Sequence, residues 1–184
     1  MFVSLEKHCS NISYFWVQYG LAAQLTKDFE AANNHFLYAK RIQKNSYQVA
    51  HALAKNKMEL GLYDLTKGRA NSDEHFQNGC SEMEKIINDP CFDRAYNYSV
   101  HSYATMLMKY YHQKSCIIPA DQCAKLNSYF NVLIQGRIDN NVKDVIMKFV
   151  RYCRDNNILE YISGLENVKD IIPYMIANEE YDIE

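Results

Sequence analysis

The stretch that decides the fold runs from Tyr14 to Lys44 and reads YFWVQYGLAAQLTKDFEAANNHFLYAKRIQK. Large and small apolar residues recur in it at spacings of four and three, the period of a helix with one buried face. The residues that carry this pattern are Trp16, Gly20 and Ala23, followed by Ala32, Phe36 and Ala39. Asp28 lies between the two sets, where a carboxylate caps a helix that begins near Phe29. We therefore predict two antiparallel helices in close contact.

These six residues resemble the signature of the tetratricopeptide repeat (TPR), a helical hairpin of about 34 residues. The family has tyrosine where this chain has Ala23, and a closing proline where this chain has Lys44. The resemblance implies an all-α fold in which hairpins stack and bind protein or peptide partners. A generic helical hairpin with ordinary core residues stays open as the alternative.

The rest of the chain shows further helical patterns separated by polar turns. Ser46 is placed to cap a helix that ends near Leu62, and Ser72 or Asp73 to cap the next one. We predict a single all-helical domain over residues 1–184 with a TPR-like stack of about three hairpins. The TPR-like hairpin covers 14–44, degenerate hairpins cover 46–88 and 93–138, and a C-terminal helical cap covers 140–177. The apolar start of the chain suggests that it continues a longer protein.

Composition excludes several classes of partner. A formal net charge of −2 gives no electrostatic attraction to nucleic acid or anionic membranes, and no apolar run approaches a membrane span. The 6 cysteines form no CxxC pair, so we expect free thiols in a cytoplasmic protein. We expect no cofactor and no metal, because His51 and His101 would lie too far apart to share an ion.

A second resemblance covers about residues 10–115. The stretches FWVQYG, DFEAANNHFLYAK, SYQVAHALAKNKMELG and RAYNYSVHSYATML resemble the C-terminal helical region of bacterial STAND-type NTPases and related anti-phage defence proteins. That region follows effector and nucleotide-binding domains, and the resemblance implies a sensor or oligomerisation arm. The chain has no GxxxxGK[ST] motif, so no ATPase activity is implied.

A faint internal repetition suggests where a partner would bind. His51, Ala54 and Met58 are echoed 50 residues later by His101, Ala104 and Met108. We place Gly20, Ala54 and Ala104 in equivalent slots on the first helix of each hairpin, which lines the concave face of a TPR stack. The predicted groove then contains Tyr14, Val17, Gln24, Gln48, His51, Lys55, Met58, His101 and Met108. This mixed polar and apolar row suits an extended peptide. Alternatively, the C-terminal helices fill the groove and these residues are core.

The alternative function is an RNA-cleaving enzyme. Arg94 and His101 are seven residues apart, hence on one face of a helix, and resemble the Arg–His pair of HEPN ribonucleases. That family usually has a polar residue after the arginine, where this chain has Ala95. We find no other catalytic pair and expect a non-enzymatic binding module. A structural adaptor that makes only oligomer contacts is the third hypothesis.

Overall fold

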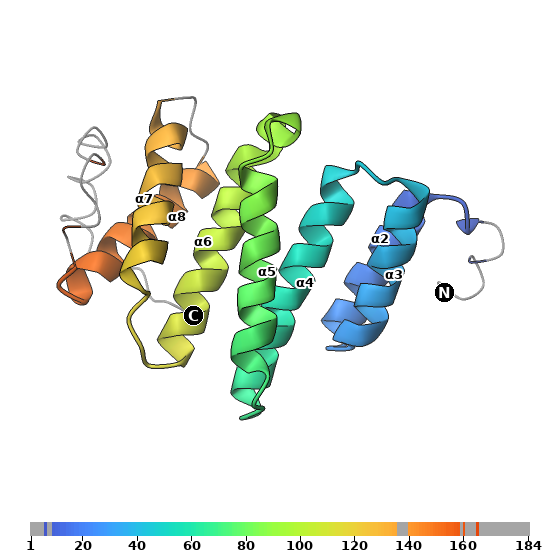
Figure 1. Ribbon diagram of the computed structural model, residues 1–184, viewed down its shortest axis with the longest axis horizontal. Coiled ribbons are helices and arrows are strands. Elements are labelled where there is room, and N and C mark those ends of the chain that lie inside the picture. Colours follow the sequence, from blue (N-terminus) through green and yellow to red (C-terminus); the bar gives the residue numbers. More distant parts are fainter. Residues whose placement is uncertain (1–5, 7–8, 136–139, 159, 161–164, 166–184) are drawn as a thin grey trace. The chain divides into compact units, whose positions relative to one another are not determined.

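The computed structural model describes residues 6, 9–135, 140–158, 160 and 165, and this part of the chain is helical, with no strand (Figure 1). The predicted all-α class is confirmed for these residues. The helices are α2 (Ser13–Leu25), α3 (Phe29–Ile42), α4 (Tyr47–Thr66), α5 (Ser72–Ile87), the 3-10 helix η1 (Pro90–Ala95), α6 (Tyr96–Gln113), α7 (Ala120–Ile134) and α8 (Asn140–Asp155). None of them combines the length and the hydropathy of a membrane span.

The chain divides into two compact units, unit 1 with residues 1–99 and unit 2 with residues 100–184. The boundary falls inside α6, and each unit is described by itself. The prediction of a single domain therefore stays a prediction. The later part of the predicted helical cap, residues 157–177, lies almost wholly outside the described residues.

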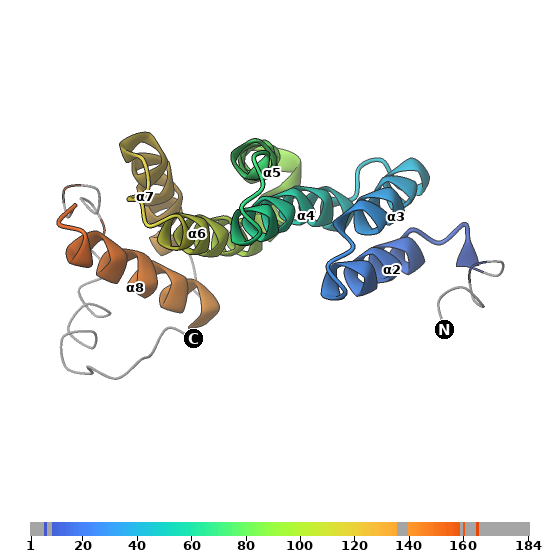
Figure 2. The same cartoon turned by 90° about the horizontal axis from the view of Figure 1, so that it is seen from below.

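Unit 1 contains two pairs of packed helices, with α2 against α3 and α4 against α5. Within it, α3 lies over α2 and α5 lies over α4 (Figure 2), and α4 also contacts both α2 and α3. Helices α2 and α3 lie close together at Gly20, where an added Cβ atom would lie 2.3 Å from Cε1 of the fully buried Phe36. Gly20 thus permits the close approach of α2 and α3 that the sequence predicts.

The helix boundaries agree in part with the predicted caps. The Asp28 side chain accepts a hydrogen bond from the Ala31 amide at 3.0 Å, as predicted. Ser46 precedes α4 but makes no capping hydrogen bond through its side chain. The prediction for α5 is wrong, because the helix already includes Ser72 and its N-cap is Asn71. The helix predicted to end near Leu62 continues to Thr66, since Gly61 faces the backbone of Phe76 and keeps α4 and α5 in contact.

Unit 2 is held together by aromatic contacts between its helices. The rings of Tyr103 and Tyr129 join α6 to α7 with their centroids 6.2 Å apart, edge to face. Phe130 and Phe149 join α7 to α8 at 5.3 Å. The Ile118 amide also donates a hydrogen bond of 2.8 Å to the Tyr152 hydroxyl, which fixes the start of α7 against α8.

Candidate functional site

Four of the nine predicted groove residues are buried in the structure. The exposed fractions of Val17, Gln24, His51 and Met58 are 7%, 7%, 5% and 0%. The prediction that they line an open groove is therefore wrong. The reason is that Gly20 and Ala54 face neighbouring helices. Residues three before or four after them lie on the same side of the helix and are therefore buried with them. Gln24 accordingly donates a hydrogen bond of 2.8 Å to the Asn56 side chain.

His51 is enclosed by aromatic side chains of unit 1. Its Nδ1 atom lies 3.3 Å from the Tyr47 hydroxyl, and its ring centroid lies 4.6 Å from that of Tyr98. The Nε2 atom is buried and has no hydrogen-bond partner among the residues that the structure describes. Burial, and to a lesser extent the positive charge of Lys55, lowers the pKa of His51 to about 4. His51 is thus a neutral core residue at pH 7 and is not exposed for ligand binding.

The other predicted groove residues lie nearer the surface. Tyr14 and Gln48 are exposed, and Lys55 is half-buried with its Nζ 3.6 Å from Glu59 Oε1. His101 and Met108 are half-buried in unit 2. The other seven predicted groove residues belong to unit 1.

The residues that α2 does expose form a different row. Tyr14, Leu21 and Leu25 have exposed fractions of 62%, 37% and 84%, and the half-buried Gln18 lies between them. Their spacing of four, three and four puts all of them on one side of the helix. We call this row the α2 face. The sequence carried a signal for it, because no charged residue occurs between Cys9 and Thr26, so α2 lacks the charged face that a surface helix usually presents to water.

The ribonuclease hypothesis depended on an α-helix that contains both Arg94 and His101. Arg94 instead lies in η1, a 3-10 helix with non-helical backbone angles at Phe92, and α6 begins only at Tyr96. Arg94 therefore lies outside the α-helix that contains His101, and the ribonuclease stays a prediction. Burial raises the pKa of the Cys123 thiol to about 11 and that of Cys153 to about 12, so neither thiol is an activated nucleophile.

A cleft of about 900 Å³ opens on another side of unit 1. It is lined by the first residues of α3, one side of α4, the loop between α4 and α5, and the first turns of α5. The sequence patterns did not predict this cleft. Its α4 residues include Lys57 and Leu60. Their helical spacing shows that they share one side of α4, but the spacing alone does not show whether that side lines a cleft or packs in the core.

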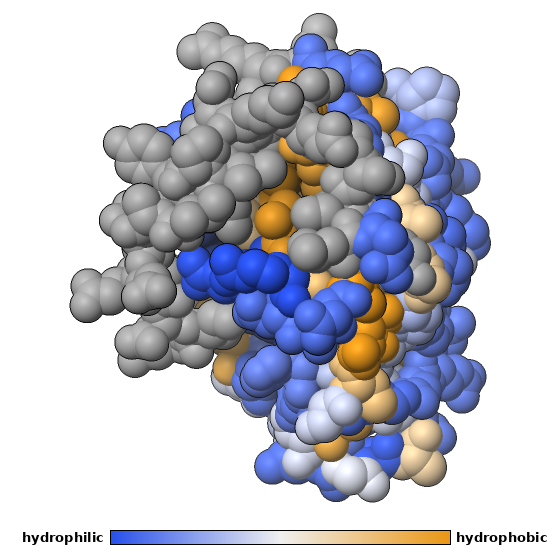
Figure 3. Space-filling model, turned by 90° about the vertical axis from the view of Figure 1, so that its left-hand side faces the viewer, coloured by the Kyte–Doolittle hydropathy of each residue, from blue (hydrophilic) through white to orange (hydrophobic). Residues whose placement is uncertain are grey.

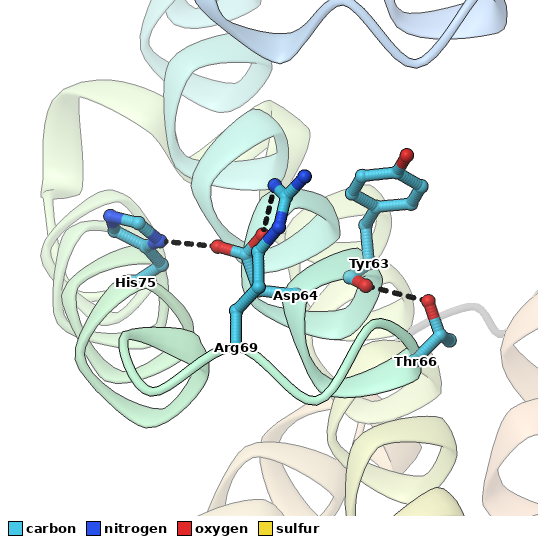
Figure 4. A network of polar contacts seen from close by, with 5 residues as sticks. All are labelled: Tyr63, Asp64, Thr66, Arg69 and His75. Carbon is cyan, nitrogen blue, oxygen red and sulfur yellow. Dashed lines mark hydrogen bonds and ion pairs between the residues drawn. The ribbon is translucent and has the colours of Figure 1, made fainter.

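Asp64 is the centre of the polar network in this cleft (Figure 4). Its side chain is only 3% exposed and receives Arg69 Nη1 at 2.9 Å and His75 Nδ1 at 2.8 Å. The Arg69 guanidinium lies 5.5 Å from the centroid of the Tyr63 ring. A buried carboxylate needs such partners to be stable. The network therefore holds the loop after α4 against the start of α5.

Two further features of the structure carry no candidate site. The described residues contain no group of three or more histidine, cysteine, aspartate or glutamate side chains placed to hold a metal ion. On unit 2, Figure 3 shows hydrophobic atoms beside residues that the structure does not describe. That apolar surface therefore supports no candidate site.

In comparisons with known proteins, no family model, no curated protein and no solved structure matches the chain. The functional conclusions therefore depend on the residues and geometry of unit 1.

Proposed function

We propose that the chain is a TPR-like helical module that binds another protein or peptide through the α2 face. One observation supports this above all: α2 exposes Tyr14, Leu21 and Leu25 on a helix without charges, although its opposite side is already packed. Burial of one large aliphatic side chain contributes roughly 1.5–3 kcal/mol. A partner that covers this row therefore gains binding free energy from apolar burial, without a charged anchor.

The neighbouring helix α4 carries polar groups at its surface. Helix α4 packs against α2 and carries Gln48 and the Lys55–Glu59 ion pair at its surface. Apolar centres with polar surroundings are typical of protein–protein interfaces. Binding here needs no catalytic group, in keeping with the non-enzymatic function that we propose.

The STAND resemblance suggests a context for this binding. On this proposal the module is the sensor or oligomerisation arm of a bacterial defence system, and its partner is another protein or another domain of the same assembly. The hairpin stack of the TPR family would position α2 and α4 side by side for this purpose. No observation favours the ribonuclease over the binding module.

Site-specific crosslinking in the native host tests the proposal. A photoreactive benzoylphenylalanine is placed at position 21 or 25, and as a control at the exposed position 34 of α3. We expect a defined crosslinked protein from 21 and 25 but not from 34. The Leu21→Asp/Leu25→Asp variant should keep its melting temperature and lose copurification of that protein. Equal crosslinking from position 34, or unchanged copurification, would contradict the proposal.

A further inference from the structure

Most of the cations that line the cleft are paired with carboxylates. Lys57 pairs with Glu82 and Arg69 with Asp64, so two of the three cations at the cleft are engaged. The N-terminus of α3 is already capped by the Asp28 carboxylate. The remaining cation, Lys27, is three residues from Glu30 on the same segment. The cleft therefore offers no net positive field for a phosphate or another anion.

Three carboxamides at the cleft have no hydrogen-bond partner within the described part of the chain. They belong to Asn33 on α3, Asn71 at the start of α5 and Asn78 on α5. Asn71 holds the N-cap position but makes no capping bond through its side chain, although asparagine is a preferred capping residue. By contrast, Asn56 in the same cleft donates to the Phe29 carbonyl at 3.0 Å and accepts from Gln24. The three free amides are thus available to a ligand.

An asparagine side chain carries two N–H donors and a carbonyl acceptor. It can therefore pair with a peptide group, which presents one donor and one acceptor. Main-chain groups of an extended segment have no internal partners and gain from such pairing, as they do when a peptide is recognised by its backbone. The three free amides come from two helices and the loop between α4 and α5, so successive peptide groups of a ligand could each meet one.

The aromatic residues of the cleft argue against a carbohydrate. Sugar rings need an open aromatic face, and the Tyr63 ring is covered by Lys67 and Arg69, each 5.5 Å from its centroid. Tyr63 also packs against Phe29, with ring centroids 5.4 Å apart. A neutral ligand that presents amides rather than ring faces fits these surroundings better.

We propose that the cleft between α3, α4 and α5 is a second binding site, which takes an extended polypeptide segment by its main chain through Asn33, Asn71 and Asn78. This site is separate from the α2 face. Lys55 on the surface of α4 and Lys57 in the cleft are two residues apart and point to different sides of the helix. Either site can therefore exist without the other.

The test selects phage-displayed random dodecapeptides on the immobilised full chain and measures the selected peptides by fluorescence polarisation. We expect the Kd to rise at least tenfold for Asn33→Ala/Asn78→Ala. The matched control Asn34→Ala, on the same helix, should leave it unchanged. Leu21→Asp/Leu25→Asp should also leave it unchanged, which separates this site from the α2 face.

A second measurement uses the unaltered protein, so that it does not depend on how the variants fold. Each peptide bond of a selected peptide is N-methylated in turn, and each side chain is replaced by alanine. Recognition of the main chain predicts about a tenfold loss of affinity at two or more N-methylated bonds, including one whose side chain tolerates alanine. The proposal is overturned if no peptide is enriched or if N-methylation has no effect. It is also overturned if the protein instead binds glycans on an array through the cleft.

Discussion

Gly20 is the residue at which the first two helices depend most on the absence of a side chain. A Cβ atom there would overlap three ring atoms of Phe36, at 2.3, 2.6 and 2.8 Å. We expect Gly20→Ala to lower the free energy of unfolding by about 1–3 kcal/mol, because the buried ring cannot move without repacking. Urea denaturation measures this change.

The double variant Gly20→Ala/Phe36→Leu tests the cause. A smaller side chain at 36 leaves room for the new methyl group, so the loss should be smaller than the sum of the two single losses. If the two losses simply add, the contact between Gly20 and Phe36 is not what limits the approach of α2 and α3.

His51 makes the stability of the protein depend on pH. Its pKa falls from an ordinary value near 6.5 to about 4 in the folded chain, so between these values the unfolded chain binds a proton that the folded chain does not. The stabilisation is complete above pH 6.5 and is lost as the pH falls towards 4. We expect His51 to account for about 3 kcal/mol of the loss in unfolding free energy between pH 7 and pH 4.

Comparison with His51→Gln isolates this effect from the titration of other groups. The variant should lose correspondingly less unfolding free energy over the same pH range when both proteins are unfolded with urea. Identical pH profiles would show that His51 titrates in the folded chain as it does in the unfolded one.

At the scale of the helix, α2 has two sides that should respond differently to the same substitution. Val17 packs in the core of unit 1, whereas Leu21 is partly exposed on the α2 face. We expect Val17→Asp to cost several kcal/mol, because it buries a carboxylate without a partner. Leu21→Asp should change the free energy of unfolding by no more than about 1 kcal/mol. Thermal melts of the two variants measure the difference, and equal losses would show that the orientation of α2 is wrong.

The sequence was sufficient to predict the helices but not how far each is rotated about its axis. The four-and-three spacing and Asp28 gave α2 and α3 nearly to the residue. The sequence did not distinguish whether Gly20 faces a partner helix or a groove, since a small residue suits both. The groove prediction placed Gly20 towards a ligand, so Val17 and Gln24 were assigned to a surface that proved to be core.

The cleft could not be predicted from the sequence for a related reason. Asp64, Arg69 and His75 follow no helical spacing in common, because Arg69 lies in the loop between α4 and α5. The contact between these side chains depends on the conformation of that loop, which sets the direction of α5 relative to α4. Hydrophobic periodicity carries no information about the loop conformation. The free amides of Asn33 and Asn78 likewise come together only when α3 and α5 are both placed against α4.

At the scale of the molecule, the division into two units predicts how local destabilisation spreads. Proteins open in cooperative units, and an amide in one unit exchanges its hydrogen without the opening of the other. Gly20→Ala destabilises unit 1, so amide exchange in α2 to α5 should accelerate, by about tenfold for each 1.4 kcal/mol lost. Amides of α7 and α8, which belong to unit 2, should keep their protection. Hydrogen–deuterium exchange followed by mass spectrometry measures both sets in one sample. An equal rise in exchange across α2 to α5, α7 and α8 would show one cooperative domain, as the sequence predicts, because then α7 and α8 could open only together with the first hairpin.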